Sequence, residues 1–147
     1  MTPPASDAPE PQATVFRFER QPLTTRKRVD RLCRSDLLVA AVQSVGSGGE
    51  TNLHAHRHLD GFWFVLSGRA RFYTTGDEVV AELGPNEGVL VPRGFPYWFE
   101  RVGDEVLEIL QVEASDQVIT SHAQVLADRI DFAEPHPDLA RAREAGE

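Results

Sequence analysis

The chain has 147 residues, of which 41% are hydrophobic and 26% are charged, and its formal net charge is −8 at pH 7. This size and balance fit one globular domain with a real hydrophobic core. The acidic charge argues against nucleic acid or an anionic membrane surface as a partner, and no apolar run approaches the ~20 residues of a membrane span.

The first third of the chain predicts an arm followed by strands. Residues 1–13 are rich in Pro, Ala and acidic side chains, so we expect them to be disordered. Residues 15–18 alternate and predict a short strand. Cys33 is the only cysteine, so no internal disulfide can form and we expect a cytoplasmic protein. Residues 37–45 are a long aliphatic run that ends in a glycine-rich turn, which is typical of a buried strand.

Short strands separated by Gly and Pro turns fill the centre of the chain. The pattern predicts strands over residues 62–66, 69–75, 78–83, 88–91, 97–99 and 105–113. So many short strands, without a βαβ unit, indicate an all-β sandwich or barrel. The apolar spacing within residues 115–130 predicts an amphipathic helix or irregular packing against the barrel. We therefore expect an arm over residues 1–13, a barrel over 14–113 and a partly helical extension over 114–147.

Three of the five histidines lie within five residues. His54, His56 and His58 have a spacing of two, and Asp60 follows them just before an apolar strand. Side chains on a strand alternate between its faces, so the three imidazoles can face the same way. Imidazoles that converge in this manner are ligands for a divalent metal such as Fe, Mn or Zn, and the cluster predicts a metal site.

The chain resembles the cupin family over residues 37–112, in two motifs that occur in the family's order. The residues that match these motifs are Gly48, His54, His56, Gly68, Pro92 and Gly94. The resemblance implies an all-β double-stranded β-helix, the cupin jelly-roll barrel, with a short helical or irregular C-terminal segment. It also implies a homodimer, for which an edge strand near residue 15 is a candidate.

The ligand positions of the family are only half kept. Its members usually hold a metal with three His and one Glu, of which His54 and His56 remain here. The family's Glu position falls at Gly61, and the His position of its second motif falls at Tyr97. The usual metal site therefore cannot be carried over unchanged.

Three interpretations remain open. In the first, a divalent metal is kept, and His58, Asp60 or Tyr97 completes the ligand shell of His54 and His56. Asp60 would point outward on a regular strand, and His58 would face inward only if the strand continued past His56. In the second, the metal is lost and the barrel holds a small molecule in an apolar, aromatic pocket. In the third, the protein is a structural or regulatory dimerisation module.

The function expected first is that of a metal-dependent oxygenase, cyclase or isomerase acting on a small, partly apolar or aromatic metabolite; the alternative is a metal-free binding or regulatory module. The candidate acids and bases are Tyr97, Asp60 and Glu108. The candidate substrate-binding residues are Phe62, Phe64, Arg71, Tyr73, Trp98 and Gln111. Glu108 and Gln111 have opposite parity on one strand, so only one of them can face the cavity, and the pattern favours Gln111. The remaining histidines, His122 and His136, are expected outside the site.

Overall fold

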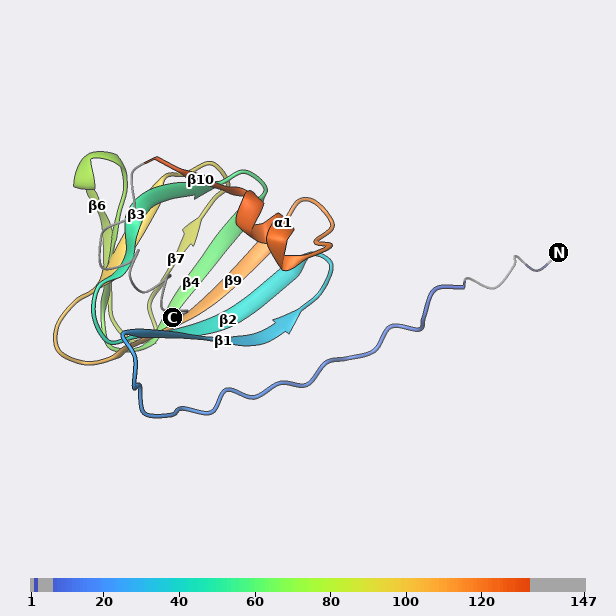
Figure 1. The fold of residues 1–147 in the computed structure, drawn as a ribbon, viewed down its shortest axis with the longest axis horizontal. Helices are drawn as coiled ribbons and strands as arrows, with labels where there is room; N and C mark the ends of the chain where they lie inside the picture. The colour runs from blue at the N-terminus through green and yellow to red at the C-terminus, as the bar shows by residue number, and fades with distance from the viewer. Residues whose placement is uncertain (1, 3–6, 133–147) are drawn as a thin grey trace.

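Two five-stranded sheets face each other in the computed structural model, which describes residue 2 and residues 7–132 (Figure 1). The elements in chain order are β1 (Lys27–Arg34), β2 (Leu38–Val45), β3 (Gly49–His56), β4 (Leu59–Ser67), β5 (Ala70–Tyr73), η1 (Thr75–Asp77), β6 (Val79–Leu83), β7 (Gly88–Val91), β8 (Tyr97–Arg101), β9 (Leu107–Ser115), α1 (His122–Ala127) and β10 (Arg129–Asp131).

The chain crosses repeatedly from one sheet to the other. The first sheet has the order β1-β2-β9-β4-β7, the second has the order β10-β3-β8-β5-β6, and the strand pairs are antiparallel. Strands β2 to β5 and β6 to β9 thus wind between the sheets as a double-stranded β-helix. The predicted all-β jelly-roll architecture is confirmed.

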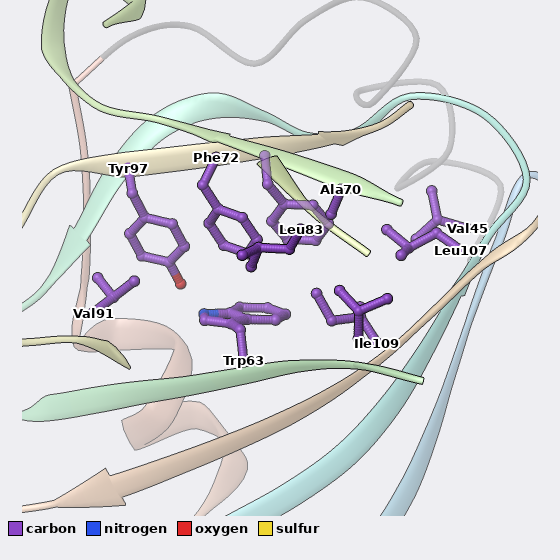
Figure 2. Packing of buried hydrophobic residues seen from close by; sticks show 11 residues of the cluster. Val45, Trp63, Ala70, Phe72, Leu83, Val91, Tyr97, Leu107 and Ile109 are labelled. Carbon is purple, nitrogen blue, oxygen red and sulfur yellow. The ribbon is translucent and has the colours of Figure 1, made fainter. Parts of the chain in front are cut away.

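The core lies between the two sheets and is rich in aromatic rings (Figure 2). Its buried members are Val45, Trp63, Val65, Ala70, Phe72, Leu83, Val91, Tyr97, Phe99, Leu107 and Ile109. The ring of Trp63 lies with its centroid 5.0 Å from that of Phe99 and 5.9 Å from that of Phe72. Each large apolar side chain buried in this way contributes about 1.5–3 kcal/mol to folding.

Gly68 makes the tight turn between β4 and β5, where the family resemblance places a conserved motif glycine. Its φ angle is 78°, a conformation that L residues rarely adopt. A Cβ atom there would lie 2.7 Å from the carbonyl oxygen of Val106, so the turn can pack closely only without a side chain.

The N-terminal part differs from the prediction. Residues 15–18 are not a strand, because no neighbouring strand pairs with them, and the side chain of Val15 is 81% exposed. The first strand is instead β1, which pairs with β2 at the edge of the first sheet. Residues 20–23 lie against the barrel, and the earlier described residues form an extended segment that runs away from it (Figure 1). The predicted disorder of residues 1–13 stays a prediction, since residues 1 and 3–6 lie outside the described part.

The C-terminal part also differs in detail. Of the extension predicted over residues 114–147, residues 133–147 with His136 lie outside the described part of the chain. Within the range predicted as helical, α1 has only six residues, because β9 continues to Ser115 and β10 begins at Arg129. Ser121 caps α1 by accepting a hydrogen bond from the backbone N–H of Gln124. Strand β10 pairs with β3 and adds an edge to the second sheet. Among the described residues, no helix is long and apolar enough to cross a membrane.

Candidate functional site

Strand β3 carries His54 and His56 to one end of the barrel interior. His54 is 2% exposed, and its register partners are Tyr97 on β8 and Asp131 on β10. The imidazole centroids of His54 and His56 are 5.5 Å apart, and the ring of Tyr97 lies 4.4 Å from that of His54. The alternation of β3 therefore places both imidazoles beside a phenol.

The tautomer of His54 follows from its contact with the main chain. Its Nδ1 lies 3.0 Å from the carbonyl oxygen of Asn52. A carbonyl oxygen only accepts, so Nδ1 carries the proton and donates it. In the neutral ring Nε2 is then the nitrogen with the lone pair, which is the form needed for a base or for a metal ligand.

His56 lies beside a carboxylate that comes from the end of α1. Its Nδ1 is 3.4 Å from Oδ2 of Asp128, a residue that is buried and also accepts a hydrogen bond from the backbone N–H of His58 through Oδ1. A carboxylate at Nδ1 favours the proton on that nitrogen and stabilises the imidazolium when a second proton arrives. The contact is an ion pair when His56 carries a second proton.

The two histidines line a cavity of about 130 Å³ inside the barrel mouth. Strands β4, β8 and β9 contribute Trp63, Tyr97, Gln111 and Glu113 to it. Gln111 accepts a hydrogen bond from Gln43 Nε2 at 2.7 Å and donates one to Oε1 of Glu113 at 2.5 Å. This chain of bonds sets the orientation of the Gln111 amide, because its oxygen and its nitrogen have different partners.

The C-terminal elements cover the same cavity. His122, Val125 and Leu126 of α1 line it, together with Arg129 at the start of β10. Arg129 donates from Nη2 to Oδ1 of Asn52 at 2.7 Å and from Nε to Oδ1 of Asp131 at 2.8 Å. Thus α1 and β10 close a mouth that the barrel strands would otherwise leave more open.

Three residues predicted as ligands, acids or bases lie elsewhere. His58 lies beyond the end of β3, so the alternation of the strand no longer determines where its side chain points. Its Nδ1 is 3.0 Å from Oδ1 of Asp116. Asp60 points outward as its parity requires, and it accepts a hydrogen bond from the backbone N–H of Arg93. Glu108 also has outward parity and lines a separate hollow of about 380 Å³ under residues 20–23. The predicted roles of these three residues in a common site are not supported by this placement.

Most predicted substrate-binding side chains also lie outside the cavity. Phe62 and Phe64 stack on the outer face of β4, because Trp63 and Val65 take the inner positions. Three others form a separate cluster on the outer face of the second sheet, namely Arg71, Tyr73 and Trp98. Gln111 alone of this predicted set lines the cavity, as its parity indicated.

The outer cluster on the second sheet is held together by its own contacts. Tyr73 stacks on Trp98 with ring centroids 4.0 Å apart and donates a hydrogen bond to Glu100 at 2.7 Å. Arg71 donates to Glu82 at 3.0 Å, and this bond lowers the pKa of the Glu82 carboxyl. Burial is the main cause that raises the pKa of Tyr73. These contacts indicate that the residues of this cluster stabilise the outer face of the sheet.

Several residues in or beside the cavity were not predicted as site residues. Glu113 could have been found, because it continues the inward alternation of Gln111 on β9. Trp63 has the inward parity of Val65, so the alternation of β4 could have indicated it as well. Asp128 and Arg129 reach the site because the C-terminal segment folds over it. No local sequence pattern predicts that these two residues belong to the site. His122 was expected outside the site but lines the cavity.

The donor set at this end of the barrel fits a metal ion poorly. Among the described residues, no group of three or more His, Cys, Asp and Glu side chains is arranged to hold a metal ion. Gly61 stands where the family resemblance places a Glu ligand, and a Cβ atom there would lie 3.2 Å from Nε1 of Trp63. His54, His56 and His122 all line the cavity, but in the described part of the chain they are not grouped as the three or four protein ligands of a typical site are.

The fold and the matched motifs define a small jelly-roll barrel with a cavity between its sheets. A family model described as "Cupin domain" matches residues 41–113, and the chain is a member of the cupin family. No match was found among curated proteins.

Solved structures share the fold at low sequence identity. An uncharacterized conserved protein with a double-stranded beta-helix domain from Klebsiella pneumoniae has a TM-score of 0.58 at 20% identity, and the match covers 68% of this chain and 81% of that one. Streptomyces PAC13 with uridine has a TM-score of 0.57 at 14% identity over 76% and 83% of the two chains. KdgF from Halomonas sp. has a TM-score of 0.55 at 14% identity over 66% and 87%.

Proposed function

We propose that this cupin binds a small polar metabolite in the barrel cavity and transfers a proton to or from it without a metal ion. The observation that carries the proposal is that His56 lines the cavity while its Nδ1 lies 3.4 Å from Oδ2 of Asp128 behind it. A histidine with a carboxylate at Nδ1 can accept a proton at Nε2 near neutral pH. His56 is therefore the general base or acid in this proposal, and Asp128 positions it.

His54 and Tyr97 supply the second proton-transfer group. Their rings are 4.4 Å apart, and both line the same cavity as His56. A phenol can donate a proton to a developing negative charge while the opposite base removes another. An elimination or an isomerisation needs these two operations. Both reactions belong to the range that the family resemblance implies.

A likeness of fold is compatible with this chemistry. The structure of Pac13, described as a unique nucleoside dehydratase, has a TM-score of 0.56 to this chain at 12% identity. At such identity the likeness concerns the fold alone. It supports the proposal only in that a barrel of this shape is used for a dehydration elsewhere.

The metal-dependent interpretation has weaker support, because Gly61 and Tyr97 replace two of the family's four ligands. The two interpretations differ in an easily measured quantity. Untagged protein incubated with Fe, Mn or Zn salts and then desalted should retain far less than one metal per chain. A His54→Ala, His56→Ala variant should retain the same small amount.

The proposed activity is tested by screening small oxygenated metabolites against metal-stripped protein, with ligand binding and product formation followed by NMR. We expect turnover by the stripped protein that is lost in His56→Ala and reduced about 100-fold or more in Asp128→Asn, as is typical when proton transfer is impaired. Glu108→Gln and Asp60→Asn are the controls, because both carboxylates lie outside the cavity, and they should keep full activity.

Three outcomes would count against the proposal. Activity that appears only after a metal is added would restore the metal-dependent interpretation. Binding of metabolites without any turnover would favour the metal-free binding module that the sequence also allows. Turnover that survives in His56→Ala would show that the paired histidine is not the proton-transfer group.

A further inference from the structure

Trp63 lines the cavity and carries a buried hydrogen-bond donor. Its side chain is 2% exposed, its ring lines the cavity, and its Nε1 has no hydrogen-bond partner in the described part of the chain. The indole nitrogen can donate but cannot accept. Burial of such a donor without a partner is unfavourable, so its position in a core strand calls for an explanation.

The position of the indole is tied to the missing side chain at Gly61. Both residues have the inward parity of β4, and Nε1 of Trp63 lies 3.2 Å from where a Cβ atom on Gly61 would be. The absence of that side chain thus provides the space for the N–H end of the ring. Figure 2 shows this nitrogen and the hydroxyl of Tyr97 at the same end of the core, and the two ring centroids are 6.2 Å apart.

We infer that the N–H of Trp63 binds an acceptor oxygen of the ligand, and that the ligand therefore carries a carbonyl or carboxylate group. The inference rests on the proposed function, since it specifies the chemistry of the molecule held in the same cavity. The imidazoles and the phenol there can each donate or accept a hydrogen bond, so they do not discriminate between a ligand that donates and one that accepts. The indole, a donor only, requires an acceptor opposite it and disfavours an ammonium group.

The placement also connects binding to the proposed reaction. A hydrogen bond from the indole to a carbonyl oxygen would draw electron density away from the adjacent carbon, and a proton on the neighbouring carbon would become more acidic. His56 lines the same cavity and is the proposed acceptor of that proton. Trp63 would then bind the oxygen on which negative charge develops.

Because the chain has two tryptophans, the inference can be tested directly. Protein labelled with ¹⁵N at the indole nitrogen should give two signals, and Trp98 serves as an internal reference because its Nε1 already donates to Asp77 at 3.2 Å. The protein is titrated with acetate, with acetamide and with ethylammonium chloride at constant ionic strength. Acetate tests a carboxylate, acetamide tests a neutral carbonyl, and ethylammonium offers no acceptor oxygen.

We expect acetate, acetamide or both to move the Trp63 indole proton downfield in a saturable manner, while the Trp98 signal stays in place. Ethylammonium should move neither signal. Absence of a saturable Trp63 shift with both oxygen-bearing probes would overturn the inference, as would an equal shift of the two indoles. If the imidazole signals of His54 and His56 respond while Trp63 does not, the inference fails and the proposed function stands. If none of these signals responds to the probes or to the metabolites of the screen, both fail.

Variants provide a second measurement. Trp63→Phe keeps an aromatic ring but removes the N–H, and it should weaken binding of the responding probe about tenfold, the factor expected for one hydrogen bond to a charged acceptor. Trp98→Phe is the matched control and should bind as the wild type does. If Trp63→Phe does not fold, benzothienylalanine incorporated into a Trp98→Phe background replaces the indole N–H by sulfur at nearly the same shape. Unchanged affinity in that protein would refute the role of the N–H.

Discussion

Arg20 and Glu108 form an ion pair that joins the N-terminal segment to the first sheet, with Nε and Oε1 2.5 Å apart. The Glu108 side chain is 7% exposed and that of Arg20 is 67% exposed. A buried carboxylate is stable in its ionised form only when a cation or hydrogen-bond donors face it. The pair explains why a carboxylate can lie on the covered outer face of β9, away from the barrel cavity.

We predict that Arg20→Ala lowers the free energy of unfolding by about 1–3 kcal/mol, since it leaves the buried carboxylate of Glu108 without its cation. Arg17→Ala is the control, because Arg17 is exposed in the same segment, and its effect should lie within ±0.5 kcal/mol, as is usual at the surface. Urea unfolding followed by fluorescence measures both variants. Equal effects of the two substitutions would show that the pair does not stabilise the fold.

The Gly61 position should couple energetically to Trp63. Gly61→Ala places a Cβ atom 3.2 Å from the indole nitrogen, and we expect a loss of about 1–3 kcal/mol from overpacking. In a Trp63→Phe background the smaller ring leaves more room, so the same alanine should cost less. A double-mutant cycle by chemical denaturation gives the coupling energy, and additive effects would mean that the two positions are independent.

We expect the contribution of Tyr73 to the free energy of unfolding to decrease at alkaline pH. Burial raises its pKa in the folded state, so the unfolded chain loses this proton first. This contribution is fully present below the ordinary tyrosine pKa of about 10 and is lost as the pH rises from there through the raised value. The advantage of the wild type over Tyr73→Phe, about 1 kcal/mol at neutral pH from the bond to Glu100, should therefore shrink in alkali.

Unfolding curves of both proteins at several pH values measure this difference, and Tyr97 is present in both, so its own titration cancels. A difference that stays constant from neutral pH to strongly alkaline pH would contradict the assignment to Tyr73.

The homodimer expected from the family resemblance stays a prediction. The strand near residue 15 that was its candidate contact does not form, and we now expect the contact on the outer face of the first sheet. Phe62 on β4 and Leu90 on β7 are register partners there, and they are 45% and 66% exposed. Leu90→Lys should shift the protein toward the monomer in sedimentation velocity, because it adds a charge to an apolar contact. Val79→Lys on the second sheet is the control and should leave the association unchanged. A wild-type protein that is monomeric at all concentrations would exclude this interface.

Most of the strands could be predicted from the local pattern of apolar residues and turns. The prediction over residues 88–91 coincides with β7, and that over 78–83 begins one residue before β6, because alternation and Gly turns act over a few residues. The basic run at the start of β1 indicated only a solvated strand edge or a turn, since the segment shows no clean apolar alternation. Strand β10 has three residues, and only its pairing with β3 makes it a strand.

The residues of the site could be predicted from the local sequence pattern less well than the strands. The inward parity of Gln111 and the outward parity of Asp60 could be read from strand periodicity, and both agree with the structure. His58 could not be assigned this way, because the end of β3 depends on the turn into β4 rather than on the residues themselves. The outward position of Phe62 was missed for a related reason: apolar residues occupy both faces of β4, so hydrophobicity alone does not tell the inner face from the outer one.

The sequence by itself determined an all-β sandwich or barrel, because strand alternation and turn geometry are local properties of the chain. The resemblance to the cupin family implied the jelly-roll topology and the inward position of the histidine pair. Only the tertiary structure decided which groups meet that pair. Asp128 and Arg129 arrive from a segment more than seventy residues away from His54 and His56, through the folding of α1 and β10 over the barrel mouth. Such contacts depend on how distant segments pack against one another, and no short stretch of sequence contains that information.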